Sequence, residues 1–313
     1  MSDKFNEIYN QSINDPEKFW KKAADDIFWF KKPTKILNRS TPPFYKWFED
    51  GVTNTCYNAL DVHIDQGNGK RTALIYDSPI TGNKSKFTYE ELRSKVSKFA
   101  GALRKEGVNK GDRVIIYMPM IPEAVVAMLA CARIGAIHSV VFGGFASNEL
   151  ASRIDDSKAK ILVTASCGFE PGRVVEYKPL VDEAIKLANH KIDKMILFQR
   201  SGNEVKLNAP SEVSWEEVIS NAKEIDCEEM RSNEFAYILY TSGTTGTPKG
   251  IVRDIGGHIV ALKWTMKNIY NIDEGDIWWS ASDIGWIVGH SYIVYAPLFK
   301  GCTTVLFLSP IHI

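Results

Sequence analysis

The sequence is poor in the features that mark disulfide-rich, zinc-binding, secreted or membrane-spanning proteins. Its five cysteines are an odd number with no C-x-x-C pair, so neither a disulfide framework nor a structural zinc site is expected. No apolar run is long enough to span a bilayer, and the N-terminus lacks the apolar core of a signal peptide. We therefore expect a cytoplasmic protein that keeps its thiols reduced.

The charge is balanced, which removes another set of functions. Lys+Arg and Asp+Glu are both 38, so nothing electrostatic indicates a nucleic-acid or anionic-membrane partner. We find no Ser-His-Asp arrangement and no metal-ligand set, and we expect no metal site in this chain and assign no catalytic residue with certainty. The 313 residues, 44% apolar and 24% charged, suit one large soluble domain or two ordinary ones.

The first sixty residues differ from the rest by their many aromatic side chains. Asp15-Pro16 predicts a helix start, and Phe19, Ala23 and Ile27 then recur at four-residue spacing. We expect these aromatics to pack this segment, residues 1–60, onto a main domain of residues 61–313.

From about residue 71, predicted strands alternate with predicted helices. Thr88-x-x-Glu91 and Ser214-x-x-Glu217 are capping boxes that open two of the helices. The alternation predicts an α/β fold with mainly parallel sheets covered by helices on both faces. The predicted strands are Ala73–Tyr76, Val114–Met118, Ile137–Phe142, Ile161–Ala165, Met195–Phe198, the run ending at Tyr240, and Thr303–Phe307. The predicted helices between them are residues 88–106, Pro122–Ile134, Asn148–Ile154, Leu180–Ala188 and 214–222.

One loop carries most of the functional signal, and it directly follows the strand that ends at Tyr240. It consists of Thr241, Ser242, Gly243, Thr244, Thr245, Gly246, Thr247, Pro248, Lys249 and Gly250. Its glycines allow close backbone approach to a ligand, and its hydroxyls and successive N–H groups supply donors for an anion. Lys249 adds a point charge for a phosphate. The loop is therefore predicted to bind a polyphosphate at the carboxyl end of a parallel strand.

Two other interpretations of this loop are available from the residues. It could be a solvated turn after a core strand, because short motifs carry false positives. A Walker A loop is excluded, since Pro248 and Gly250 flank Lys249 where that motif needs Gly and Ser/Thr. Over all ten positions the loop resembles the phosphate loop of the adenylate-forming superfamily. That resemblance implies the large N-terminal domain of this fold, truncated, and places the β- and γ-phosphates of ATP on the loop.

A second segment, Ala132–Phe145, resembles the acetyl- and propionyl-CoA synthetase branch of that superfamily. The resemblance places Gly143 and Gly144 beside the channel for the pantetheine arm of CoA, where a thin ligand needs close backbone approach. A plain strand-to-helix turn explains the same glycines equally well. His138 lies in an apolar run and is expected to be a satisfied core histidine.

A third segment, Glu170–Leu180, carries a candidate phosphate ligand. The resemblance places Gly172 and Arg173 in the CoA site, with Arg173 on the 3′-phosphate, because a guanidinium gives bidentate contact and stays charged. Without the resemblance, Arg173 would be interpreted as a surface charge. Acetyl-CoA synthetases usually have a second arginine where this chain has Glu170, and this departure favours the propionyl branch.

A fourth segment, Trp278–Tyr292, contains the candidate acyl pocket. The resemblance implies that Trp286 and Ile287 wall the carboxylate pocket and that Val288 faces CoA. Valine in place of the usual threonine again favours the propionyl branch. One methylene in an apolar pocket is worth only about 1–3 kcal/mol, so acetate and propionate would be separated imperfectly. From the residues alone, ordinary core packing of the aromatics is the simpler interpretation.

The resemblance implies AMP-forming activation of a short-chain carboxylate, propionate or acetate, with ATP, Mg²⁺ and CoA as co-substrates. It covers this chain but only the front half of the family. The lysine that promotes adenylation, an acidic Mg²⁺ ligand and the small C-terminal domain lie in the part not represented. We expect a premature stop, a frameshift or a fragment, and inactivity of the chain alone. The alternatives are an inactive nucleotide-binding fragment or another adenylating enzyme, and the oligomeric state is left open.

Overall fold

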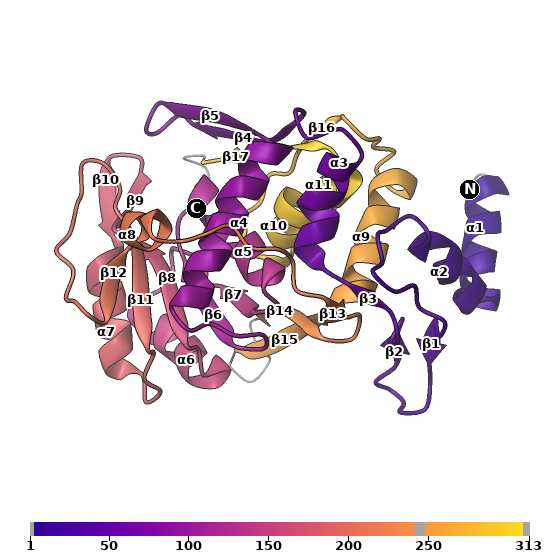
Figure 1. Cartoon of the computed structure of the whole chain (residues 1–313), viewed down its shortest axis with the longest axis horizontal. Helices are drawn as coiled ribbons and strands as arrows, with labels where there is room; N and C mark the ends of the chain where they lie inside the picture. The colour runs from indigo at the N-terminus through magenta and orange to yellow at the C-terminus, as the bar shows by residue number, and fades with distance from the viewer. Residues whose placement is uncertain (1–2, 242–247, 309–313) are drawn as a thin grey trace.

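The N-terminal segment forms two helices that dock onto the main body. A computed structural model describes residues 3–241 and 248–308 (Figure 1). Helices α1 (Asp3–Asn14) and α2 (Pro16–Ala24) come first, and the Asp15 side chain accepts a hydrogen bond from the Lys18 amide at 3.1 Å, as its N-cap position predicts. The rings of Phe19 and Trp20 lie 5.5 and 5.8 Å from Trp264 of α9 (Ile255–Asn268). The expected aromatic packing is confirmed, whereas α1 was not predicted.

Short strands and a buried turn connect this segment to the rest of the chain. Strand β1 (Leu37–Asn38) pairs with β2 (Lys46–Trp47), and β3 (Val52–Thr53) pairs with β13 (Met230–Arg231). The chain then continues through η1 (Tyr57–Asp61) and α3 (Val62–Asp65). The β3–β13 pair ties the N-terminal segment to the linker that precedes the strand of the phosphate loop.

The main sheet has seven strands, and the predicted parallel arrangement is confirmed. Its order is β12 (Glu212–Ser214), β11 (Lys194–Phe198), β8 (Ile161–Ala165), β6 (Arg113–Tyr117), β7 (Ile137–Val140), β14 (Phe235–Thr241) and β15 (Lys249–Asp254). All neighbours are parallel except β14 and β15, which form an antiparallel pair. The carboxyl ends of β6, β7, β8, β11 and β14 therefore share one edge of the sheet.

Helices cover both faces of this sheet because its central strands are apolar on both sides. Side chains such as Ile115 and Leu162 pack with α6 (Ser147–Ser157) and α7 (Tyr177–Leu187), and their neighbours Ile116 and Val163 pack in the cluster of the opposite face. That face carries α4 (Tyr89–Lys105), α5 (Pro122–Arg133) and α8 (Trp215–Ser220). Thr88 and Glu91 form the complete capping box predicted for α4.

A second, four-stranded sheet joins distant parts of the sequence. Its order is β16 (Ile277–Trp279), β17 (Thr303–Phe307), β4 (Thr72–Ser78) and β5 (Asn83–Thr88). The first three strands are parallel, and Thr304 of β17 pairs with Leu74 of β4. Figure 1 shows this sheet above the helices of the core. Helices α10 (Ile287–Gly289), η2 (His290–Tyr295) and α11 (Ala296–Lys300) lead into β17.

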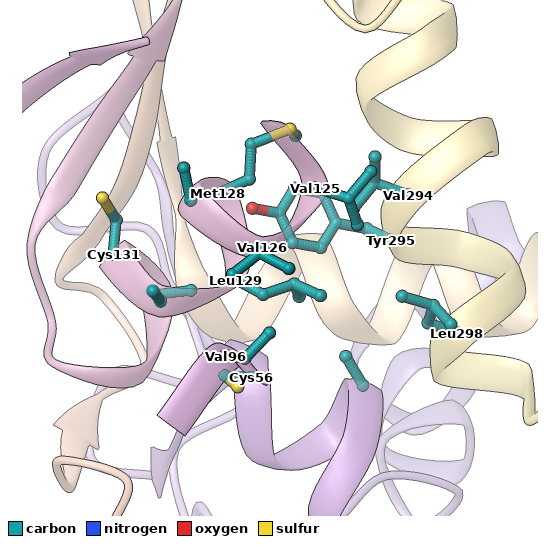
Figure 2. Close-up of a cluster of buried hydrophobic side chains, with 14 of the residues drawn as sticks. Cys56, Val96, Val125, Val126, Met128, Leu129, Cys131, Val294, Tyr295 and Leu298 are labelled. Carbon is teal, nitrogen blue, oxygen red and sulfur yellow. The ribbon is translucent and has the colours of Figure 1, made fainter. Parts of the chain in front are cut away.

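A continuous apolar core joins the central helices. Tyr295 is fully buried in a cluster that includes Val125, Leu129 and Leu298 (Figure 2). Its hydroxyl lies 3.0 Å from Nε2 of His138, so the polar end of the ring is paired. Cys131 and Cys302 are core thiols, as predicted, and burial raises the pKa of both.

A short hairpin extends from the carboxyl edge of the main sheet. It consists of β9 (Cys167–Glu170) and β10 (Arg173–Glu176), which directly follow β8.

In the part of the chain that the structure describes, no helix is both long and apolar enough to cross a membrane.

Candidate functional site

The glycine loop after β7 and the loop that enters α10 meet at the carboxyl edge of the main sheet. The ring of Trp286 lies 5.6 Å from Phe142 and 5.9 Å from Phe145, the two residues that bracket Gly143 and Gly144. A Cβ on Gly285 would come within 2.9 Å of the Phe142 Cα, so glycine is what allows this approach. The structure thus brings together two of the segments selected from the sequence.

The two candidate acyl-pocket residues and the neighbouring CoA candidate Val288 are not core residues. Trp286, Ile287 and Val288 expose 44, 46 and 49% of their surface, which excludes ordinary core packing for these side chains. The loop beneath them is fixed by hydrogen bonds from the amide of Gly285 to a carboxylate oxygen of Asp283 at 2.7 Å and from the amide of His290 to the Trp286 carbonyl at 2.8 Å. The aromatic wall is therefore exposed on a backbone that hydrogen bonds hold in place.

Ile287 also lines a cavity of about 500 Å³. Its walls come from the N-terminal segment, β14, α9 and η2, and they are largely apolar, with Trp20, Trp47 and Leu262 among them. Of Trp286, Ile287 and Val288, Ile287 alone lines this cavity. Arg253, Asp254 and His258 also line the cavity, and the acyl-pocket role of Ile287 stays a prediction.

Contacts with other side chains of the protein are enough to require glycine at one or both of the positions 143 and 144. A Cβ on Gly143 would lie 2.1 Å from the Tyr177 hydroxyl, and one on Gly144 would lie 2.5 Å from the Phe142 ring. The Tyr117 hydroxyl donates to the carbonyls of Gly143 and Phe145, at 3.2 and 2.8 Å. These contacts support the strand-to-helix turn interpretation, and the CoA role of the glycines stays a prediction.

The predicted phosphate loop follows β14, a strand parallel to β7, but three residues predicted as loop, Thr241, Lys249 and Gly250, are strand residues. Thr241 ends β14 and pairs with Lys249, and Tyr240 pairs with Gly250. Pro248 precedes β15, and both Thr241 and Lys249 are exposed. Residues 242–247 (Ser242, Gly243, Thr244, Thr245, Gly246 and Thr247) lie outside the described residues, so the prediction that they cradle phosphates is not tested.

Arg153 of α6 links the phosphate-loop strand to the glycine loop, and no sequence pattern indicates it. Its guanidinium lies 4.8 Å from the Phe145 ring and 5.2 Å from the Tyr240 ring, and it pairs with Glu149 at 2.7 Å. The Tyr240 hydroxyl also donates to Asp156 at 2.6 Å. No local pattern could reveal Arg153, because both aromatic partners lie outside its own helix.

Arg173 is an exposed charge that already has an acidic partner. Its side chain is 70% exposed, and its Nη2 lies 2.5 Å from Oε2 of Glu170 across the β9–β10 turn. Gly172 has a φ of +75° with open space around its Cβ position, so backbone conformation rather than close approach requires glycine here. Glu170, which occupies the expected place of a second arginine, neutralises the candidate CoA ligand instead.

A set of three buried histidines lies next to β14. The Nε2 atoms of His138 and His290 are 3.1 Å apart, and the His258 ring contacts Tyr237 and Tyr295. Burial lowers the pKa of His290 to about 4 and that of His258 to about 3, so these rings are neutral near pH 7. His138 is buried as predicted, but only its Nε2 is hydrogen-bonded, while its Nδ1 has no partner among the described residues.

Within the described ranges, one group of three potential metal ligands lies close enough to share an ion: Cys56, Asp61 and Cys227. Arg133 already occupies this group: it donates to both carboxylate oxygens of Asp61, at 2.8 and 3.0 Å, and its Nη1 lies 3.5 Å from the Cys56 sulfur. A guanidinium in this position supplies the positive charge, so we assign no metal here. The described residues likewise offer no carboxylate cluster for Mg²⁺ at the ends of the phosphate loop.

Comparison with known proteins gives consistent matches along the chain. A family model described as AMP-binding enzyme matches residues 62–312, and one described as acetyl-coenzyme A synthetase N-terminus matches residues 5–59. Acyl-CoA synthetase short-chain family member 3, mitochondrial, of Rattus norvegicus is 55% identical over 95% of this chain and 44% of its own length. Propionate–CoA ligase of Escherichia coli is 45% identical over 97% of this chain and 48% of its own length.

A solved structure shows the same architecture. Acetoacetyl-CoA synthetase from Streptomyces lividans superimposes with a TM-score of 0.86 at 27% sequence identity, covering 95% of this chain and 45% of that one. The chain thus spans a little under half the length of these relatives.

Proposed function

The chain belongs to the AMP-binding enzyme family, in its acyl-CoA synthetase branch, and from that membership we propose that it forms the front half of an AMP-forming ligase for propionate or acetate. The proposed reaction has two steps. The carboxylate attacks the α-phosphorus of ATP and pyrophosphate leaves, and the thiol of CoA then attacks the acyl-adenylate and releases AMP. The domain boundary near residue 60 and the cytoplasmic location remain part of this proposal, and the five free thiols support the latter.

The observation that carries the proposal is the contact between Trp286 and the Phe142–Phe145 loop. It brings the candidate acyl wall against the candidate CoA channel at the edge where Thr241 ends its strand. A reaction that joins a carboxylate, a nucleotide and a thiol needs their binding groups to converge in this way.

Each residue has a role that follows from its chemistry. Lys249 and the loop from Thr241 to Gly250 would bind the β- and γ-phosphates of ATP, and Trp286 with Ile287 would limit the length of the acyl chain. Arg173, Gly172, Gly143, Gly144 and Val288 would contact CoA. Bound Mg²⁺ would share the phosphate charge, and its protein ligand is not among the described residues. The adenylation lysine would also come from the half of the enzyme that this chain does not contain.

The thioester product tests this proposal. We define the completed enzyme as this chain fused to the part of the E. coli propionate–CoA ligase that extends beyond their match. Incubated with propionate, ATP and free CoA, it is expected to form propionyl-CoA and AMP in equal amounts. Propionyl-adenylate without a thioester would favour another class of adenylating enzyme. An inactive nucleotide-binding fragment, the remaining alternative, would give neither product after completion.

A further inference from the structure

A second cavity at the carboxyl edge of the main sheet contains none of the residues assigned to the proposed reaction. It has a volume of about 670 Å³ and lies between the β4–β5 hairpin, the start of α5, β9 and the end of β11. Its apolar walls include Ile80, Ile121 and Phe198. A cavity of this size and lining is within the range of small-molecule sites.

Arg200 is the basic group of this cavity, which Glu123 also lines, and the relative exposure of Arg200 is 6%. Its Nη1 donates to the Cys167 carbonyl at 3.3 Å, and its guanidinium lies 4.4 Å from the centre of the Phe169 ring. The Ser166 hydroxyl accepts from the Arg200 amide at 2.9 Å and fixes the backbone. The side chain is thus held in place by neutral groups.

Arg200 has no acidic partner among residues 3–241 and 248–308, since no carboxylate of these residues lies within ion-pair distance of it. Its Nε and Nη2 make no hydrogen bond to those residues either. A buried charge of this kind is normally paired, because leaving it unpaired costs several kcal/mol. The unpaired side of the guanidinium therefore calls for an anion from outside the chain.

The N-terminus of α5 reaches the same cavity. This helix of 12 residues begins at Pro122, and its N-cap residue Ile121 offers no side-chain cap. Pro122 has no N–H, the Ala124 amide donates to the Ile121 carbonyl at 3.0 Å, and Glu123 already places an acidic side chain in the first turn, so the helix end adds no free donor to the cavity. Glu123 also lines the cavity; burial raises the pKa of its carboxyl, and its negative charge opposes an anion beside Arg200.

We propose that this cavity binds the phosphate group of a nucleoside monophosphate, with Arg200 as the anion-binding group. A guanidinium gives a phosphate bidentate contact, and the apolar walls accommodate a base and a sugar. The cavity is much larger than a phosphate ion, which is why a nucleoside is expected to add affinity. This site is separate from the proposed ligase site and does not depend on that activity.

Calorimetric titration of the 313-residue chain with AMP and with inorganic phosphate tests the proposal. We expect a site that binds AMP at least about 10-fold more tightly than phosphate, a difference of about 1.4 kcal/mol. Arg200→Gln should weaken AMP at this site at least 10-fold. Arg200→Lys, which keeps the charge and guards against a folding defect, should weaken it less. The exposed Arg39→Gln removes one charge elsewhere and should change nothing.

Two further variants distinguish this cavity from the phosphate loop and test the part played by Glu123. Lys249→Gln disables the proposed phosphate loop and should leave the Arg200-dependent binding of AMP intact. The result for this cavity therefore does not depend on whether the ligase proposal is correct. Glu123→Gln removes a negative charge from the cavity and should strengthen phosphate binding several-fold. The proposal is overturned if AMP binds no better than phosphate, if binding is unchanged in Arg200→Gln, or if Glu123→Gln weakens phosphate, because Glu123 would then not oppose an anion there.

Discussion

The indole of Trp286 packs against the phenyl ring of Phe142, with ring centroids 5.6 Å apart, although the two residues belong to loops on either side of the phosphate-loop strand. Offset aromatic pairs of this kind contribute about 0.5–1.5 kcal/mol beyond the area they bury. The contact positions the exposed Trp286 beside the loop that contains Gly143 and Gly144, at the edge of the sheet where Thr241 ends its strand.

Trp286→Ala is expected to relax chain-length selection in the completed enzyme. Removing the indole opens volume, and one methylene in an apolar pocket is worth about 1–3 kcal/mol. The ratio of kcat/KM for butyrate over propionate should rise by about 10-fold, the low end of that range. Trp279→Ala is the matched control, because Trp279 is 57% exposed and contacts Phe307. An equal rise in both variants would remove Trp286 from the acyl pocket.

Glu170→Gln is expected to strengthen CoA binding by freeing Arg173. An exposed ion pair is worth about 0.2–1 kcal/mol, so the KM for CoA should fall by a factor of about 1.4–5. The same assay with dephospho-CoA, which lacks the 3′-phosphate, should show no change. If both ligands respond equally, Arg173 does not read the 3′-phosphate.

Gly143→Ala is expected to destabilise the chain, because the new Cβ would lie 2.1 Å from the Tyr177 hydroxyl. Overpacking of this kind costs about 1–3 kcal/mol, measurable by urea unfolding. Adding Tyr177→Phe should recover most of the loss. Gly67→Ala, at a φ of +82° in open space, should lose stability through backbone strain that Tyr177→Phe does not relieve. Absence of recovery in the first pair would contradict a steric origin of the loss.

Stability is expected to fall as the pH drops from 7 to 5. The folded-state pKa values of His290 and His258, about 4 and about 3, lie below the unfolded value of 6.5. On acidification the unfolded chain therefore takes up protons before the folded chain does. At pH 5 the two rings together lower the free energy of unfolding by about 4 kcal/mol.

Asp254 opposes this trend. Burial raises the pKa of Asp254 to about 6, so its ionised form destabilises the folded chain above that pH. Protonation at lower pH relieves this loss, and the free energy of unfolding recovers about 1 kcal/mol at pH 5. Urea unfolding at the two pH values measures the net fall, and Asp254→Asn should make it larger. A fall that Asp254→Asn leaves unchanged, or stability that is flat between pH 7 and 5, would contradict this assignment.

The sequence predicted the elements whose signals are local. Apolar runs located β8 and β17 to the residue, and the Thr88–Glu91 box located the start of α4. The predicted box at Ser214 is half present: the Ser214 hydroxyl accepts from the Glu217 amide at 3.0 Å. Helix α8 ends at Ser220, about two residues before the predicted end at Ala222. Strand β15 was not predicted, because it is an exposed edge strand whose side chains show no apolar alternation.

The candidate site was only partly accessible from the sequence. Motifs selected Trp286, the glycine pair and Arg173, but pairing between distant segments carries no local signal. The Arg153 contacts with Phe145 and Tyr240, the Glu170–Arg173 ion pair and the unpaired Arg200 all depend on the fold. Composition suggested that the aromatics of 278–292 were core residues, and this was wrong for Trp286 because its ring lies at the sheet edge.

Exchange of labelled pyrophosphate into ATP isolates the activation step, because it reports acyl-adenylate formation before CoA is involved. In the completed enzyme we predict exchange that depends on propionate and that Lys249→Gln lowers by at least about 10-fold, or 1.4 kcal/mol. Exchange no greater with propionate than without it would contradict the claim that this edge of the sheet activates a short-chain carboxylate.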